Sequence, residues 1–234
     1  MDAERHITGR KVSFIGAGNM AEALIKGILG VGVTTPENII ATDVNPERLS
    51  WIRATYGIRT EAVNRRALEQ TEIVLLCVKP QILPHVLQEI GAALTVDHML
   101  ISIAAGVSIA RLEDGLAAAV PVVRAMPNTP AVVQRGVTAL ASGTHADADH
   151  LRVAGELFRG VGMVVDVPET VMDAVTAVSG SGPAYVFFLM EAMRDAAVRH
   201  GLSEELATRM VIETVRGAGE LAARAHEPPE RLRQ

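Results

Sequence analysis

Short apolar runs alternate with amphipathic segments through the first two-thirds of the chain. Runs of four or five apolar residues without a helical period are typical of strands that are buried on both faces of a sheet. The strands predicted in this way are residues 12–15, 39–42, 73–78, 99–103 and 122–125, with weaker candidates at 137–141 and 163–165. Helices are predicted between them at residues 46–56, 82–90 and 107–116. This alternation favours an α/β fold with a doubly wound, mainly parallel sheet.

The first predicted strand runs directly into the loop Gly16-x-Gly18-x-x-Ala21. Glycines in this pattern permit a tight turn and a close approach of the backbone to a pyrophosphate, and the small alanine lets the next helix pack against the strand. The N–H groups at the start of that helix then face the anion. A purely structural turn is the alternative, but the strand before the loop and the helical pattern after it favour a Rossmann-type dinucleotide site.

The pattern changes near Pro168, and no convincing strand follows it. Helices are predicted from 182 to about 200 and from 203 to about 225. We therefore predict a Rossmann-type domain at residues 9–167 and an all-helical domain at 168–234. Two long helices make a poor core on their own, so the helical domain is expected to pack against a second subunit.

The overall composition is compatible with an enzyme of one large or two modest domains. Of the 234 residues, 49% are apolar and only 3% are aromatic, so aliphatic side chains must build the core. The net charge of −5 comes from 22 basic and 27 acidic residues without long runs of either sign, which argues against a nucleic-acid partner. No apolar segment approaches the roughly twenty residues of a membrane span.

Cysteine and histidine usage adds two further expectations. The single cysteine, Cys77, lies within an apolar run and is expected to be buried without a disulfide. Because the N-terminus also lacks the apolar core of a signal peptide, a cytoplasmic location is expected. The seven histidines do not cluster with carboxylates at metal-ligand spacing, so no metal site is expected, and His85 and His200 are interpreted as surface residues.

Polar and small residues follow several predicted strands, at the edge where parallel sheets bind ligands. Asp43 ends the second strand, where a carboxylate can accept hydrogen bonds from the adenosine ribose and so keep NADH at least competitive with NADPH. An Asx turn into the next helix is the equally weighted alternative, and Arg48 lies near enough to offset the repulsion of a 2′-phosphate. Residues 78–80 and 104–106 end two further strands, and a cofactor contact is favoured there.

Five stretches of the chain, in order, resemble the pyrroline-5-carboxylate reductase family. The longest are Arg124-Ala-Met-Pro-Asn-Thr-Pro130 and Val178-Ser-Gly-Ser-Gly-Pro-Ala-Tyr185, and the others lie at 16–20, 78–80 and 102–106. The resemblance runs from about residue 11 to the end of the chain. It implies reduction of 1-pyrroline-5-carboxylate to L-proline with NADPH or NADH, the last step of proline biosynthesis. It also implies a homodimer through the helical domain, with dimers often arranged in larger rings.

The resemblance, together with the position of Asp43, assigns residues to both ligands. The expected cofactor-binding residues are Gly16, Ala17, Gly18, Asn19, Met20, Asp43, Asn64, Val78, Lys79, Pro80, Ala104, Ala105 and Gly106. The expected substrate-binding residues are Ser179, Gly180, Ser181, Gly182 and Pro183. Backbone N–H groups at these glycines suit a carboxylate, although Ser179 or Ser181 could instead simply cap the helix. Residues 126–128 are expected either to shape the nicotinamide pocket or to form a turn.

No catalytic residue is assigned from the sequence, because a protonated imine is already electrophilic and no catalytic dyad is visible. Family members continue into a stretch similar to Ser-Pro-Gly-Gly-Thr-Thr, whereas this sequence stops before it, at Gln234. The sequence is therefore either a fragment or lacks part of the substrate site. For a protein that stops at Gln234, we expect cofactor binding with weak or absent imine reduction. A reductase of another cyclic imine and a non-catalytic dinucleotide-binding protein are the alternative functions.

Overall fold

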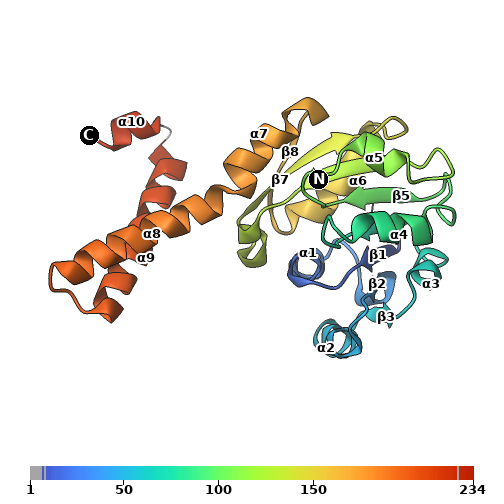
Figure 1. The fold of residues 1–234 in the computed structure, drawn as a ribbon, viewed down its shortest axis with the longest axis horizontal. Helices are drawn as coiled ribbons and strands as arrows, with labels where there is room; N and C mark the ends of the chain where they lie inside the picture. Colours follow the sequence, from blue (N-terminus) through green and yellow to red (C-terminus); the bar gives the residue numbers. More distant parts are fainter. Residues whose placement is uncertain (1–6, 8, 226) are drawn as a thin grey trace. The chain divides into compact units, whose positions relative to one another are not determined.

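The computed structural model describes residues 7, 9–225 and 227–234 (Figure 1). The chain divides into two compact units, Met1–Gly180 and Ser181–Gln234. Residues 168–180 belong to the first unit, which contains the sheet. The boundary predicted from the sequence lies before them, after residue 167. That boundary stays a prediction.

In the described part of the first unit, eight strands form one sheet in the order β3-β2-β1-β4-β5-β6-β7-β8. The strands are β1 Val12–Ile15, β2 Ile39–Thr42, β3 Arg59–Glu61, β4 Ile73–Leu76, β5 Met99–Ser102, β6 Val122–Met126, β7 Gly136–Ser142 and β8 Gly162–Asp166. All neighbours are parallel except β6 and β7. The first six strands have the order of the doubly wound dinucleotide-binding fold, so the predicted fold class is confirmed.

The helices of the first unit are α1 Asn19–Gly30, α2 Pro46–Tyr56, α3 Asn64–Leu68, α4 Leu83–Ile90, α5 Ile109–Glu113, α6 Ala148–Arg159 and α7 Met172–Val175. Single 3-10 turns lie at Pro36–Asn38, Thr129–Val133 and Glu169–Val171, and a π-helical turn lies at Thr176–Gly180. The prediction for α2 is confirmed, because Asn45 caps its start and Gly57 ends it. α5 is shorter than predicted. β3 and α3 were not predicted because they are too short to show a period, and α6 was missed although Asp147 forms a capping box with His150.

The core consists of two aliphatic layers, one on each face of the sheet. Alternate residues of a strand point to opposite faces, so Phe14 and Leu75 pack with α1, α2 and α6, whereas Ile15 and Leu76 pack with α4 and α5. These strand residues are almost completely buried. The helices therefore cover both faces of the sheet, and the loops lie at the ends of the strands.

The second unit consists, in its described residues, of α8 Gly182–Arg199, α9 Glu204–Ala225 and α10 Pro229–Leu232. Both long helices were predicted, and they pack on each other at Ala207 and Val211 of α9. Large apolar side chains of this unit are nevertheless exposed, namely Tyr185, Val186, Phe187, Phe188, Leu189, Val198, Leu202, Leu206, Met210, Ile212 and Leu221. Across residues 7, 9–225 and 227–234, the helices are all too short or too polar for a membrane span.

Candidate functional site

The glycine loop connects β1 to α1 at the switch point of the sheet, beside the end of β4. Gly16 has a φ of +95°, and a Cβ atom there would lie 2.9 Å from the carbonyl oxygen of Cys77, so the turn requires glycine. A Cβ atom on Gly18 would meet nothing within 4 Å. No side chain caps the N-terminus of α1. Open space in front of uncapped first-turn N–H groups is what a pyrophosphate needs, so this loop fits a dinucleotide.

Asp43 follows β2 and is bonded to the backbone through both carboxylate oxygens. Oδ2 accepts a hydrogen bond of 2.9 Å from the N–H of Ala17 in the glycine loop, and Oδ1 accepts one of 2.9 Å from the N–H of Asn45. The second bond is the Asx turn that the sequence suggested. Asn45 in turn caps α2 by accepting from the N–H groups of Glu47 and Arg48. Asp43 therefore fixes the glycine loop to the start of α2, and its contact with a ribose stays a prediction.

Arg48 lies on the first turns of α2, and its side chain is directed to α1. Its Nη2 lies 2.6 Å from Oε2 of Glu22, and its Nε donates to the carbonyl oxygen of Ala17 at 2.6 Å. Asn64, at the start of α3, is held in a similar way: the hydroxyl of Thr42 donates to its Oδ1 at 2.6 Å, and its Nδ2 donates to Glu89 at 2.8 Å. Asn64 thus joins the start of α3 to the end of β2 and to α4.

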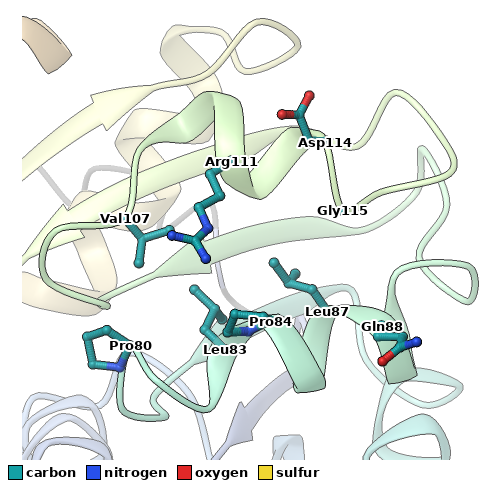
Figure 2. Close-up of a pocket in the computed structure, with 9 residues that line it drawn as sticks. All are labelled: Pro80, Leu83, Pro84, Leu87, Gln88, Val107, Arg111, Asp114 and Gly115. Atoms are coloured by element: carbon teal, nitrogen blue, oxygen red, sulfur yellow. The ribbon is translucent and has the colours of Figure 1, made fainter.

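The stretches Val78–Pro80 and Ala104–Gly106 follow β4 and β5, which are adjacent parallel strands. The N–H of Ala104 donates to the hydroxyl oxygen of Ser102 at 3.3 Å. A groove of about 270 Å³ begins beside Pro80 and continues between α4 and α5 (Figure 2). Figure 2 shows the guanidinium group of Arg111 directed between these helices. Of the predicted site residues, Pro80 alone lines this groove, so the groove adjoins the strand ends without containing them.

The segment that contains Ser179 and Gly180 is tied to the end of β6. Nδ2 of Asn128 donates to the carbonyl oxygen of Ser179 at 2.9 Å, and Oδ1 accepts from the N–H of Val137 at 2.9 Å. A Cβ atom on Gly180 would lie 2.8 Å from Cε of Met126. Met126 and Asn128 therefore contact the segment before α8. The sequence did not reveal these contacts.

A second tie joins the start of this segment to the same strand. Nη1 of Arg124 lies 2.9 Å from Oε1 of Glu169, and that oxygen also accepts from the N–H of Ile109 at 2.7 Å.

Neither serine forms the helix cap that the sequence left open as an alternative: the hydroxyl of Ser179 donates to the carbonyl oxygen of Val175, and Ser181 makes no side-chain capping bond. Ser181, Gly182 and Pro183 begin the second unit.

Other candidate chemistry is limited. Cys77 is partly buried, whereas the sequence predicted a buried side chain. Desolvation by its surroundings raises the pKa of the Cys77 thiol, so a neutral side chain is expected there at neutral pH. His85 and His200 are exposed, as predicted. Within the described ranges, no three His, Cys, Asp or Glu side chains form a group that could hold a metal ion.

Comparison with known proteins gives matches along almost the whole chain. Residues 169–234 match the family model described as pyrroline-5-carboxylate reductase dimerisation, and residues 11–106 match the model described as NADP oxidoreductase, coenzyme F420-dependent. The pyrroline-5-carboxylate reductase of Methanosarcina acetivorans is 42% identical over 224 residues, which cover 96% of this chain and 83% of that protein. The reductase of Synechocystis is 40% identical, covering 95% of this chain and 83% of that protein.

Solved structures are similar along the same length. A pyrroline-5-carboxylate reductase from Coxiella burnetii has a TM-score of 0.88 and 35% identity, covering 96% of this chain and 84% of that one. The pyrroline carboxylate reductase of Plasmodium falciparum, solved with NADP bound, has a TM-score of 0.84 and 29% identity, covering 96% of this chain and 82% of that one.

Proposed function

The chain belongs to the pyrroline-5-carboxylate reductase family, and we propose on this basis a role for each part of the site described above. It is an NAD(P)H-dependent oxidoreductase that reduces 1-pyrroline-5-carboxylate to L-proline, the final step of proline biosynthesis. The observation that carries this function is the identity of about two residues in five with the curated reductases over nearly the entire chain.

The cofactor lies, in this proposal, across the edge where β1, β2, β4 and β5 end. The pyrophosphate is bound by the uncapped N–H groups of residues 16–20, where Gly18 leaves open space. The adenosine lies between Asp43 and Asn64, which are both fixed by hydrogen bonds. The nicotinamide ring and its ribose, at the other end of the cofactor, lie against Val78–Pro80 and Ala104–Gly106. When bound, the cofactor supplies a hydride for ring carbon five of the substrate.

The substrate is held by its carboxylate in this proposal. We expect residues 179–183 to bind it through the backbone N–H groups of Gly180 and Gly182, and the hydrogen bond from Asn128 to the carbonyl oxygen of Ser179 supports the start of that stretch. Because a protonated imine accepts hydride readily, the main task of the chain is to align the two ligands. No side chain is assigned as a proton donor.

We also infer that the chain forms a homodimer through its second unit, with larger rings of dimers. The exposed apolar side chains of α8 and α9, such as Phe187, Phe188 and Met210, support this assembly, because burying them stabilises an interface. The match of residues 169–234 to a dimerisation model supports it as well.

A cytoplasmic location is supported by the presence of a single cysteine, which is typical of proteins that do not depend on disulfides.

The function is tested with the purified chain after its intact mass has been confirmed. Oxidation of NADPH and of NADH is followed with 1-pyrroline-5-carboxylate, and the reverse reaction with L-proline and NAD(P)+. For a protein whose mass shows that it extends past Gln234, we expect turnover of the five-membered cyclic imine and not of its six-membered homologue. Binding of either nucleotide by such a protein without turnover of any imine would contradict the reductase function, whereas a protein that ends at Gln234 is expected to bind the nucleotide with weak or absent turnover. The molar mass of the protein, measured by light scattering during size-exclusion chromatography, tests the dimer. The mass of a monomer would exclude it.

A further inference from the structure

The geometry points to Glu22 as a residue that determines cofactor preference, because it holds Arg48 away from the adenosine ribose. This inference rests on the proposed cofactor site and deepens it. In it, the pair of Glu22 and Arg48 favours NADH over NADPH by making the guanidinium group unavailable to a 2′-phosphate.

Arg48 is fixed by three contacts, one with α1, one with the glycine loop and one within α2. The guanidinium Nη2 lies 2.6 Å from Oε2 of Glu22, and Nε donates to the carbonyl oxygen of Ala17 at 2.6 Å. The guanidinium carbon lies 4.7 Å from the centre of the Trp51 ring, a distance typical of a cation–π contact. The side chains of Arg48 and Glu22 are only 22% and 27% exposed, so water screens this pair less than it screens a surface pair.

Glu22 is itself held in place from its other oxygen. The hydroxyl of Tyr56 donates to Oε1 of Glu22 at 3.0 Å, and the Tyr56 ring packs edge-on against Trp51 with 6.1 Å between ring centres. Burial, followed by the hydrogen bond to Glu22, raises the pKa of Tyr56, which keeps its hydroxyl proton available as a donor. Glu22 therefore links the start of α1 to both ends of α2.

This cluster lies next to the carboxylate that is placed to meet the ribose. The side chains of Asp43, Glu22 and Arg48 together carry a net charge of −1, two carboxylates against one guanidinium. A 2′-phosphate adds a charge of about −2 there and needs a cation that is free to turn toward it. Arg48 is five residues beyond Asp43 in the chain and is the cationic residue nearest to Asp43 in sequence. Its guanidinium group, however, is already paired with Glu22. A neutral side chain at position 22 would remove the ionic partner of Arg48 and leave it only the contacts with Ala17 and Trp51.

Nucleotide binding tests the inference without reliance on turnover. Dissociation constants are measured for NADPH and NADH by fluorescence, and for 2′,5′-ADP and 5′-ADP by calorimetry, with the parent chain and the variants Glu22→Gln, Arg48→Gln and their combination. We expect Glu22→Gln to shift the preference toward the 2′-phosphorylated nucleotides by about tenfold. Adding Arg48→Gln should abolish that gain. Glu47→Gln, which removes a neighbouring exposed carboxylate on α2, is the matched control and should change the preference less than about twofold.

Three results would overturn the inference, and they are distinguishable from one another. An unchanged preference in a folded Glu22→Gln variant would show that Arg48 does not respond to its partner. An equal gain with and without Arg48 would show that Glu22 acts through its own charge only. Failure of the parent chain to bind any of the four nucleotides would refute the proposed cofactor site itself, and the inference with it. Thermal unfolding of each variant establishes that it is folded.

Discussion

Substitution of Asn128 by alanine tests whether the end of β6 positions the substrate segment. The side chain is 8% exposed and makes two hydrogen bonds of 2.9 Å, one to the carbonyl oxygen of Ser179 and one from the N–H of Val137. Alanine removes both bonds at once. The N–H and carbonyl groups left behind belong to residues that are partly exposed, so water can replace a part of what is lost.

The expected cost follows from these two bonds. A net contribution of about 1 kcal/mol for each bond gives a loss of roughly 2 kcal/mol in the free energy of unfolding. If the roughly 1 kcal/mol of the bond to Ser179 is lost from the positioning of the substrate segment, kcat/KM for the imine falls about fivefold. The effect should appear in the KM for 1-pyrroline-5-carboxylate, whereas the dissociation constant of NADPH should change less than about twofold.

Steady-state kinetics, nucleotide titration and hydrogen exchange at the Gly180 amide together provide the assay. Asn128→Asp is the informative second variant, because an oxygen can still accept from Val137 but no donor remains for Ser179. Val133→Ala, at a position that is 69% exposed in the neighbouring 3-10 turn, is the matched control and should behave as the parent does. A parental KM and parental exchange at Gly180 in a destabilised Asn128→Ala variant would refute the positioning role.

Three further predictions follow from the same contacts. Asp43→Ser should shift preference toward NADPH and also weaken both cofactors, because the bond to Ala17 is lost; titration with each nucleotide measures this, and a strong NADPH preference in the parent would contradict it. Glu169→Ala should cost about 2–3 kcal/mol in urea unfolding, because Arg124, whose side chain is 8% exposed, loses its partner. Adding Arg124→Met should restore part of that loss, and additive losses would argue against a coupled pair. Because its raised pKa keeps the thiol neutral, Cys77 should react with a disulfide reagent at pH 8 far more slowly in the native chain than in guanidinium chloride; equal rates would exclude this.

The sequence by itself predicted most strands of the sheet and the glycine loop, although it missed β3, α3 and α6. The glycine loop was predictable because a turn with a φ of +95° at Gly16 is strained for any residue with a side chain. The limits of α2 were predictable because Asn45 and Pro46 start a helix by hydrogen bonding and ring geometry that involve only their neighbours. Buried parallel strands have continuous apolar runs, so the fold class was visible as well.

The tertiary structure alone decided which side chains meet at those strand ends. Glu22 and Arg48 are 26 residues apart, Arg124 and Glu169 are 45 apart, and Asn128 and Ser179 are 51 apart. No periodicity records such pairs, since each depends on strand order and on how the helices pack across the sheet. The same holds for Asp43: its residue type suggested a ribose contact or an Asx turn, and only the fold brought Ala17 to its second oxygen. Local sterics determine the loops, whereas long-range packing determines the partners of the side chains within them.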